Sequence, residues 1–111
     1  MDKLEHERQL IRKILNEYAS HRYLNTTITN VTVFDREADR YLVMMNGRDN
    51  KKFVHGCLIH VEIIDGKIWI QRDGTEYGIA NELVDTGIPK DKIVLGFKSP
   101  EIRPYTEFAA A

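Results

Sequence analysis

The first residues of the chain follow a helical repeat. Apolar side chains recur three, four and seven residues apart, at Leu4, Ile11, Ile14, Leu15 and Tyr18. Asp2, with Glu5 three residues later, is typical of a helix start. The pattern therefore predicts one amphipathic helix over residues 3–20, with its polar side toward solvent.

From Thr27 onward the repeat shortens to two, which is typical of β-strands. Thr29, Val31 and Val33 fall on one side of a predicted strand, and the alternate residues up to Phe34 fall on the other. A polar connection leads to a second predicted strand over residues 41–45. Asn46-Gly47 follows it, and this dipeptide predicts a hairpin turn.

Asp65-Gly66 lies between two apolar runs and predicts a two-residue hairpin turn. Counting outward from the turn pairs Ile64 with Lys67, Glu62 with Trp69, His60 with Gln71, and Leu58 with Asp73. The opposite face is then apolar and consists of Cys57, Ile59, Val61, Ile63, Ile68 and Ile70. We expect the helices to cover that apolar face.

The rest of the chain predicts a short second helix and an apolar segment. Apolar residues from Ile79 to Val84 have helical spacing, and Gly87 followed by Pro89 is typical of a helix end. A helical turn is expected over residues 89–92, and residues 93–97 are predicted to be a strand or a buried turn. The predicted fold is α+β, an N-terminal helix packed on a mainly antiparallel sheet of about four strands, followed by the short second helix.

Composition and charge restrict the class of protein. The 111 residues, 42% hydrophobic and 30% charged, predict a single domain over residues 1–111. A net charge of -1 argues against general binding of nucleic acids or anionic membranes. A charged start without an apolar leader, and a lone Cys57, predict a cytoplasmic protein without a disulfide.

His55, Cys57 and His60 are residue types that bind zinc. Regular strand alternation places His60 on the face opposite to the other two, so the three do not converge on one ion unless Gly56 marks a bulge. By the same alternation Cys57 packs in the core as a small apolar residue. We therefore predict no metal site, no cofactor and no catalytic residue.

Asp73 and Glu76 precede the second predicted helix. Paired carboxylates suit acid–base chemistry, and with His60 they motivate a metal-dependent hydrolase or nuclease as an alternative. Capping of the helix start explains the same residues without catalysis, and we favour it.

Two surface features are candidates for binding. Arg48, Lys51 and Lys52 form the one local group of basic residues, which suits contact with a phosphate backbone or a solvated loop. Trp69 lies on an otherwise polar predicted face, together with His60, Glu62, Gln71 and Asp73. Either a partner covers this ring or another segment of the chain does.

Several segments together resemble the XisI family. They are residues 56–61 (Gly-Cys-Leu-Ile-His-Val), 65–71 (Asp-Gly-Lys-Ile-Trp-Ile-Gln), 73–76, 78–80, 87–89, 93–97 and 105–109. The family is named for the fdxN-element excision controlling factor of heterocyst-forming cyanobacteria. One departure is Gly47-Arg48, where relatives often carry Gly-Trp.

The resemblance implies a non-enzymatic accessory factor, needed together with a companion protein, XisH, when a site-specific recombinase excises a DNA element. No catalytic residues are implied. We expect the chain to bind an XisH-like companion, or the recombinase, through the face that carries His60, Glu62, Trp69, Gln71 and Asp73. Self-association into a homodimer is another use of that face, and direct DNA contact through Arg48, Lys51 and Lys52 is the alternative function.

Overall fold

The computed structural model describes residues 3–24 and 26–111, so the predicted cap Asp2 lies outside the described residues. The elements in chain order are α1 (Lys3–Ala19), β1 (Thr29–Asp35), β2 (Arg40–Asp49), β3 (Lys52–Ile64), β4 (Lys67–Asp73), α2 (Ile79–Asp85), the 3₁₀ turn η1 (Lys90–Lys92), β5 (Ile93–Leu95) and the 3₁₀ turn η2 (Arg103–Tyr105). The predicted α+β class is confirmed, with one strand more than expected. Among the described residues, every helix is too short or too polar to cross a bilayer.

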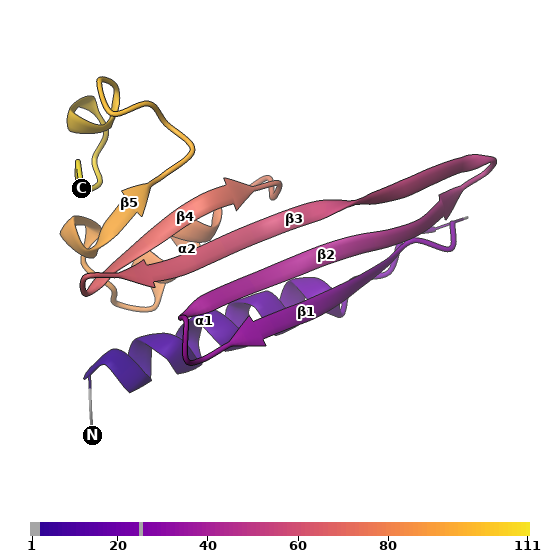
Figure 1. Ribbon diagram of the computed structural model, residues 1–111, viewed down its shortest axis with the longest axis horizontal. Coiled ribbons are helices and arrows are strands. Elements are labelled where there is room, and N and C mark those ends of the chain that lie inside the picture. The colour runs from indigo at the N-terminus through magenta and orange to yellow at the C-terminus, as the bar shows by residue number, and fades with distance from the viewer. Residues whose placement is uncertain (1–2, 25) are drawn as a thin grey trace.

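The sheet follows the chain order β1-β2-β3-β4-β5 (Figure 1). Its first four strands are antiparallel, and β5 pairs with β4 in parallel. The extra strand is the apolar segment that the sequence left open between a strand and a buried turn. A parallel partner requires a crossover connection, and α2 supplies it.

Both α-helices lie behind the sheet in Figure 1 and contact each other. Their apolar sides meet one aliphatic face of the sheet, as predicted. The fully buried residues include Ile11, Leu15, Tyr41, Val43, Ile59, Val61, Ile68, Ile70, Ile79, Leu83 and Ile93. Since burial of each such side chain contributes about 1.5–3 kcal/mol, this face is the main source of stability.

The end of α2 has the predicted glycine stop. Gly87 has a φ of 104°, which favours glycine. Its N–H donates to the Val84 carbonyl at 3.0 Å, and the Ile88 N–H donates to the Leu83 carbonyl at 3.1 Å. This pair of hydrogen bonds is a Schellman motif, and it turns the chain toward β5.

The Asp65-Gly66 turn is confirmed, with φ values of 50° and 79°. The predicted register holds from the turn as far as Glu62 paired with Trp69. Beyond that point Gln71 is an extra residue in β4, so His60 pairs with Arg72 and Ile59 with Asp73. The predicted pairs of His60 with Gln71 and of Leu58 with Asp73 are therefore wrong, because a β-bulge shifts the register by one residue.

A second bulge lies between β2 and β3. Val43 pairs with Ile59 and Met44 pairs with Cys57, which leaves Leu58 as the extra residue. Leu58 packs against the core. Because residues directly opposite each other share a face, Cys57 lies on the outward face with Met44. The predicted inward position of Cys57 is wrong, since the bulge reverses the strand alternation at Leu58.

The β2 strand continues through Asn46-Gly47, where a turn was predicted. The hairpin turns instead at Asn50, which has a φ of 58° and follows the last paired residue of β2, Asp49. Gly47 serves close packing instead, because a Cβ there would lie 2.4 Å from the Thr27 carbonyl oxygen. The absence of a side chain at Gly47 thus allows the segment that leads into β1 to pack directly against β2.

A half-buried polar contact joins α1 to the β1–β2 turn. The Arg8 guanidinium donates to both carboxylate oxygens of Asp39, at 2.7 and 3.0 Å. The Tyr41 hydroxyl donates to the same carboxylate at 2.8 Å. These donors hold the pKa of Asp39 below its ordinary value, chiefly through Arg8. Burial, and then the neighbouring Asp39 carboxylate, raises the pKa of Tyr41 to about 12.

A second ion pair joins α1 to η1. Glu7 is 1% exposed and interrupts the apolar stripe of α1, since it lies three residues after Leu4 and four before Ile11. Lys92 Nζ lies 3.1 Å from Glu7 Oε2, an ion pair without a well-directed hydrogen bond. The lysine reaches Glu7 from the segment that leads into β5, and the neighbouring Arg8 binds the β1–β2 turn, so two other segments of the chain contact the same turn of α1.

Gly47→Ala tests the close approach of Thr27. We expect a loss of about 2 kcal/mol in the free energy of unfolding, because the new methyl group meets backbone that has no room to move. Urea denaturation measures this loss. Gly56→Ala is the matched control, since a Cβ at Gly56 meets nothing within 4 Å. Equal losses in the two variants would contradict the packing argument.

Asp39→Asn tests the half-buried contact with Arg8. Asparagine tolerates the φ of 53° at this position but carries no charge. Because the folded-state pKa of Asp39 is lowered, its contribution is present above the unfolded-state pKa and is lost as pH falls through the folded-state value. We expect the variant to lose about 2 kcal/mol of stability at neutral pH. The difference should shrink below pH about 4.

Urea denaturation at neutral and strongly acidic pH checks this expectation. Asp65→Asn is the control, since Asp65 also has a positive φ, of 50°, but lies in an exposed turn. A deficit of Asp39→Asn that is the same at both pH values would rule out the charge as its cause.

Candidate functional site

One face of the sheet lacks a helical cover among the described residues. It is the front face in Figure 1. The register brings six outward side chains of β1, β2 and β3 together, and we refer to them as the open face: Val31, Val33, Leu42, Met44, Cys57 and His60. Val31 and Val33 are 49% and 50% exposed, and the other four are half-buried.

Charged groups border the open face at one end. His60 Nε2 lies 2.9 Å from Glu62 Oε1. Arg40 Nε lies 3.8 Å from the other oxygen of Glu62. The predicted site residues His60 and Glu62 are therefore together, and they form a polar margin beside the exposed valines.

Trp69 is opposite Glu62 on the outward face, as predicted. The Arg103 guanidinium lies 5.0 Å from the centre of its ring. Arg103 is itself held by the Lys98 and Gly96 carbonyls, at 3.0 and 3.3 Å. The C-terminal segment thus provides an internal cover for the half-buried Trp69 ring, and this part of the outward face is not free.

The remaining two residues of the predicted surface have structural contacts. Gln71 is the bulge residue, and its amide lies close against Gly96. Asp73 accepts hydrogen bonds from the backbone N–H groups of Thr75 and Ile79, at 3.0 and 2.8 Å. Because Ile79 is the first residue of α2, the capping interpretation of Asp73 is confirmed.

The Leu58 bulge places Cys57 and His60 on the same outward side, so the predicted separation of these two residues is wrong. Within residues 3–24 and 26–111, however, there is no group of three His, Cys, Asp or Glu residues that could hold a metal ion. The Cys57 thiol donates to the Ile59 carbonyl at 3.2 Å, and burial raises its pKa. A raised pKa favours the thiol over the nucleophilic thiolate at neutral pH.

Polar groups also meet where α1 packs on α2. Burial, and then the nearby Glu82 carboxylate, raises the pKa of Tyr18 to about 12. One oxygen of Glu82 is buried without a hydrogen-bond partner. These groups lie on the two helices, away from the open face.

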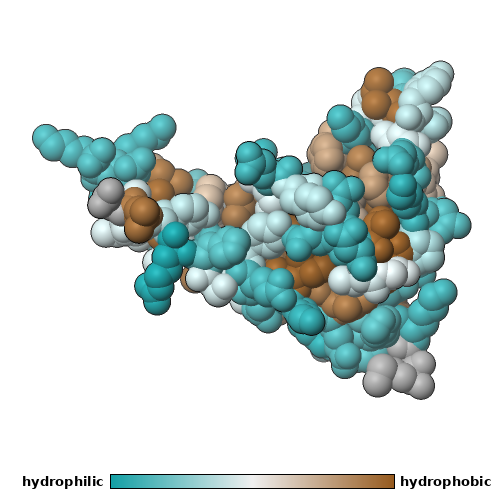
Figure 2. Space-filling view, turned by 180° about the vertical axis from the view of Figure 1, so that it is seen from behind, coloured by the Kyte–Doolittle hydropathy of each residue, from teal (hydrophilic) through white to brown (hydrophobic). Residues whose placement is uncertain are grey.

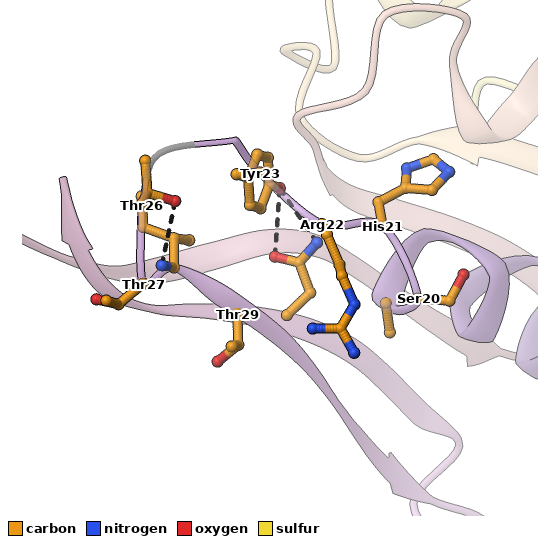
Figure 3. Close-up of a pocket in the computed structure, with 10 residues that line it drawn as sticks. Ser20, His21, Arg22, Tyr23, Thr26, Thr27 and Thr29 are labelled. Atoms are coloured by element: carbon orange, nitrogen blue, oxygen red, sulfur yellow. Dashed lines mark hydrogen bonds between the residues drawn. The ribbon is translucent and has the colours of Figure 1, made fainter.

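A hollow of about 520 Å³ lies between the end of α1 and the start of β1, and residues 19–23 and 26–30 line it (Figure 3). The Asn30 amide donates to the Tyr23 hydroxyl at 3.1 Å and to the Tyr18 carbonyl at 3.2 Å. These bonds hold the loop against α1. Of the residues that line the hollow, Tyr23 and Asn30 are thus engaged in holding the loop.

The three basic residues Arg48, Lys51 and Lys52 are together at the closed end of the β2–β3 hairpin. All three are exposed, next to the exposed ring of Phe53. The sequence reasoning singled out the cations but missed Phe53 and the exposed valines. Alternation along β1 puts the two valines on the same side of the strand, and their hydrophobicity would predict that this side is buried. The structure shows the reverse, because Asn30 on the other side is buried and the valines are exposed.

Nearly the whole chain can be aligned with known proteins. Residues 1–110 match the family model described as XisI protein. The chain belongs to the XisI family. No curated protein matches this XisI family member.

Two solved structures from Anabaena variabilis are similar to this XisI family member. One is a XisI-like protein, with a TM-score of 0.90 and 36% identity over 98% of this chain and 100% of the other. The second is the fdxN element excision controlling factor XisI, with a TM-score of 0.83 and 38% identity over 99% of this chain and 100% of the other. The name of the second protein describes a controlling factor rather than an enzyme.

Arg103→Ala tests the internal cover of Trp69 in this XisI family member. Trp69 is the single tryptophan of the chain, so tryptophan fluorescence reports on it alone. We expect the emission maximum to move to longer wavelength, because water reaches a ring that the guanidinium no longer covers. Lys98→Ala is the control, since that ammonium lies over Phe97 instead. An unshifted maximum in Arg103→Ala would show that Arg103 does not shield the ring.

Proposed function

We propose that this protein is a non-enzymatic accessory factor in the controlled excision of DNA, and that it acts by binding a protein partner through the open face. The observation that carries the proposal is the pair of half-exposed valines, Val31 and Val33, on a sheet face without a helical cover among the described residues. Adjoining apolar side chains on such a face are typical of a protein interface.

Two further observations support the proposal. The similar protein from Anabaena variabilis is named as an excision controlling factor. Two of the three residues that suggested catalysis have structural contacts, since the Asp73 carboxylate binds the first N–H of α2 and His60 contacts Glu62. The proposed partner is the XisH-like companion that the family resemblance implies. His60 and Glu62 would form the polar margin of the interface.

The test is co-purification and calorimetry with an XisH-like protein. The variant Val31→Thr with Val33→Thr keeps the β-branched shape but replaces one methyl group at each position by a hydroxyl. We expect an affinity about tenfold lower, which corresponds to roughly 1.4 kcal/mol. Ile102→Thr is the control, because Ile102 is also 49% exposed but lies outside the open face.

Unchanged affinity in the valine variant would exclude the open face as the interface. Light scattering of the chain alone tests the rival use of the same face. A homodimer that the valine substitutions dissociate, without affinity for the companion, would replace partner binding by self-association.

A further inference from the structure

The β2–β3 hairpin extends beyond the body of the protein as an arm. The β1 strand pairs with β2 up to Asn46, whereas β2 and β3 pair with each other as far as Asp49 and Lys52. On the other side, β4 reaches only Ile59 of β3. Figure 1 shows that the closed end of the hairpin therefore projects far from both α-helices. The segment before β1 lies along one flank of the arm, because the Thr27 N–H donates to the Arg48 carbonyl at 3.0 Å. The flank formed by residues 52–56 of β3 has no further paired strand among the described residues, so that flank and the turn are open to a ligand.

The end of the arm is cationic. Arg48, Lys51 and Lys52 are exposed there, against one carboxylate, Asp49. The excess of positive charge is confined to this part of the surface, because the whole chain has a net charge of -1. Figure 2, which views the molecule from the helix side, shows a hydrophilic end to the arm with hydrophobic atoms beside it.

An exposed stack of rings adjoins these cations. The Phe53 side chain is 55% exposed. The Arg48 guanidinium lies 5.3 Å from the centre of its ring, and the His55 ring stacks on it at 6.1 Å with an angle of 8°. Arg48 also donates to the Lys51 carbonyl at 3.5 Å, so the guanidinium is held across the turn. Flat cationic and aromatic groups are thus presented together before any ligand binds.

We propose that the end of this arm contacts DNA, with Arg48, Lys51 and Lys52 on backbone phosphates and Phe53 against the adjoining sugar and base surface. A two-stranded β-ribbon fits the major groove of duplex DNA, and lysine and arginine are the usual phosphate contacts. Aromatic rings beside a cationic groove are typical of single-strand binding. The shared chemistry is a phosphodiester backbone with an accessible base or sugar.

Fluorescence anisotropy with a labelled duplex, and with one of its strands alone, tests the proposal on the full chain. For three phosphate contacts on duplex DNA, log K against log salt should have a slope of about -3 between roughly 50 and 200 mM salt. Arg48→Ala, Lys51→Ala and Lys52→Ala together should weaken binding at low salt by about tenfold or more and remove most of that slope.

The matched control is Lys3→Ala, Lys13→Ala and Lys98→Ala, which removes three exposed cations elsewhere and produces the same net charge. It should bind DNA as the wild type does. Circular dichroism confirms that both triple variants fold. Phe53→Leu then separates the two DNA forms, because loss of the ring should weaken binding of the single strand more than binding of the duplex if bases stack on it.

Absence of binding to either DNA form at low salt would overturn the proposal, as would an equal loss in the two triple variants. A third result would also overturn the proposal: the wild type does not bind DNA, and the triple variant of Arg48, Lys51 and Lys52 no longer binds the companion. In that case the arm would bind an acidic protein partner instead. The proposal is independent of the open face, because the valine variant tests that face separately and leaves the cations of the arm in place.

Discussion

The helices and the sheet are held together by the burial of one aliphatic sheet face beneath α1 and α2. The isoleucines and valines of β3 and β4 supply most of that face, and the two helices reach it from the same side. Within residues 3–24 and 26–111 the α-helices are α1 and the short α2, and both lie on that side. The outward side is therefore left to the C-terminal segment, which covers Trp69, and to the open face beyond it.

Polar contacts then determine how the helices sit on the sheet. Asp39 binds Arg8 at one end of α1, and Lys92 reaches the buried Glu7 from the segment before β5. Removing one member of such a pair leaves a charge with less solvation than it has in water, so each pair restricts α1 to one position. Asp73 has the corresponding role for α2, because its carboxylate binds the first N–H of that helix.

Two unlike surfaces result on one small protein. The open face is apolar with a polar margin at His60 and Glu62, which suits a protein partner. The end of the β2–β3 arm is cationic and aromatic, which suits a nucleic acid. Their separation along the hairpin would allow a protein and DNA to be held at the same time. Such an arrangement is consistent with a controlling factor that assists a recombination reaction without catalysing it.

Local signals in the sequence were enough to predict three elements: α1 from its helical repeat, the Asp65-Gly66 turn, and the glycine stop of α2 at Gly87. They also predicted which isoleucines of β3 and β4 form the core, since alternation holds close to a tight turn. The bulges at Leu58 and Gln71, the use of Gly47 for close packing, and the covering of Trp69 by Arg103 could be recognised in the folded structure but not in the sequence. Those features depend on segments far apart in the chain, and short-range periodicity carries no information about such contacts.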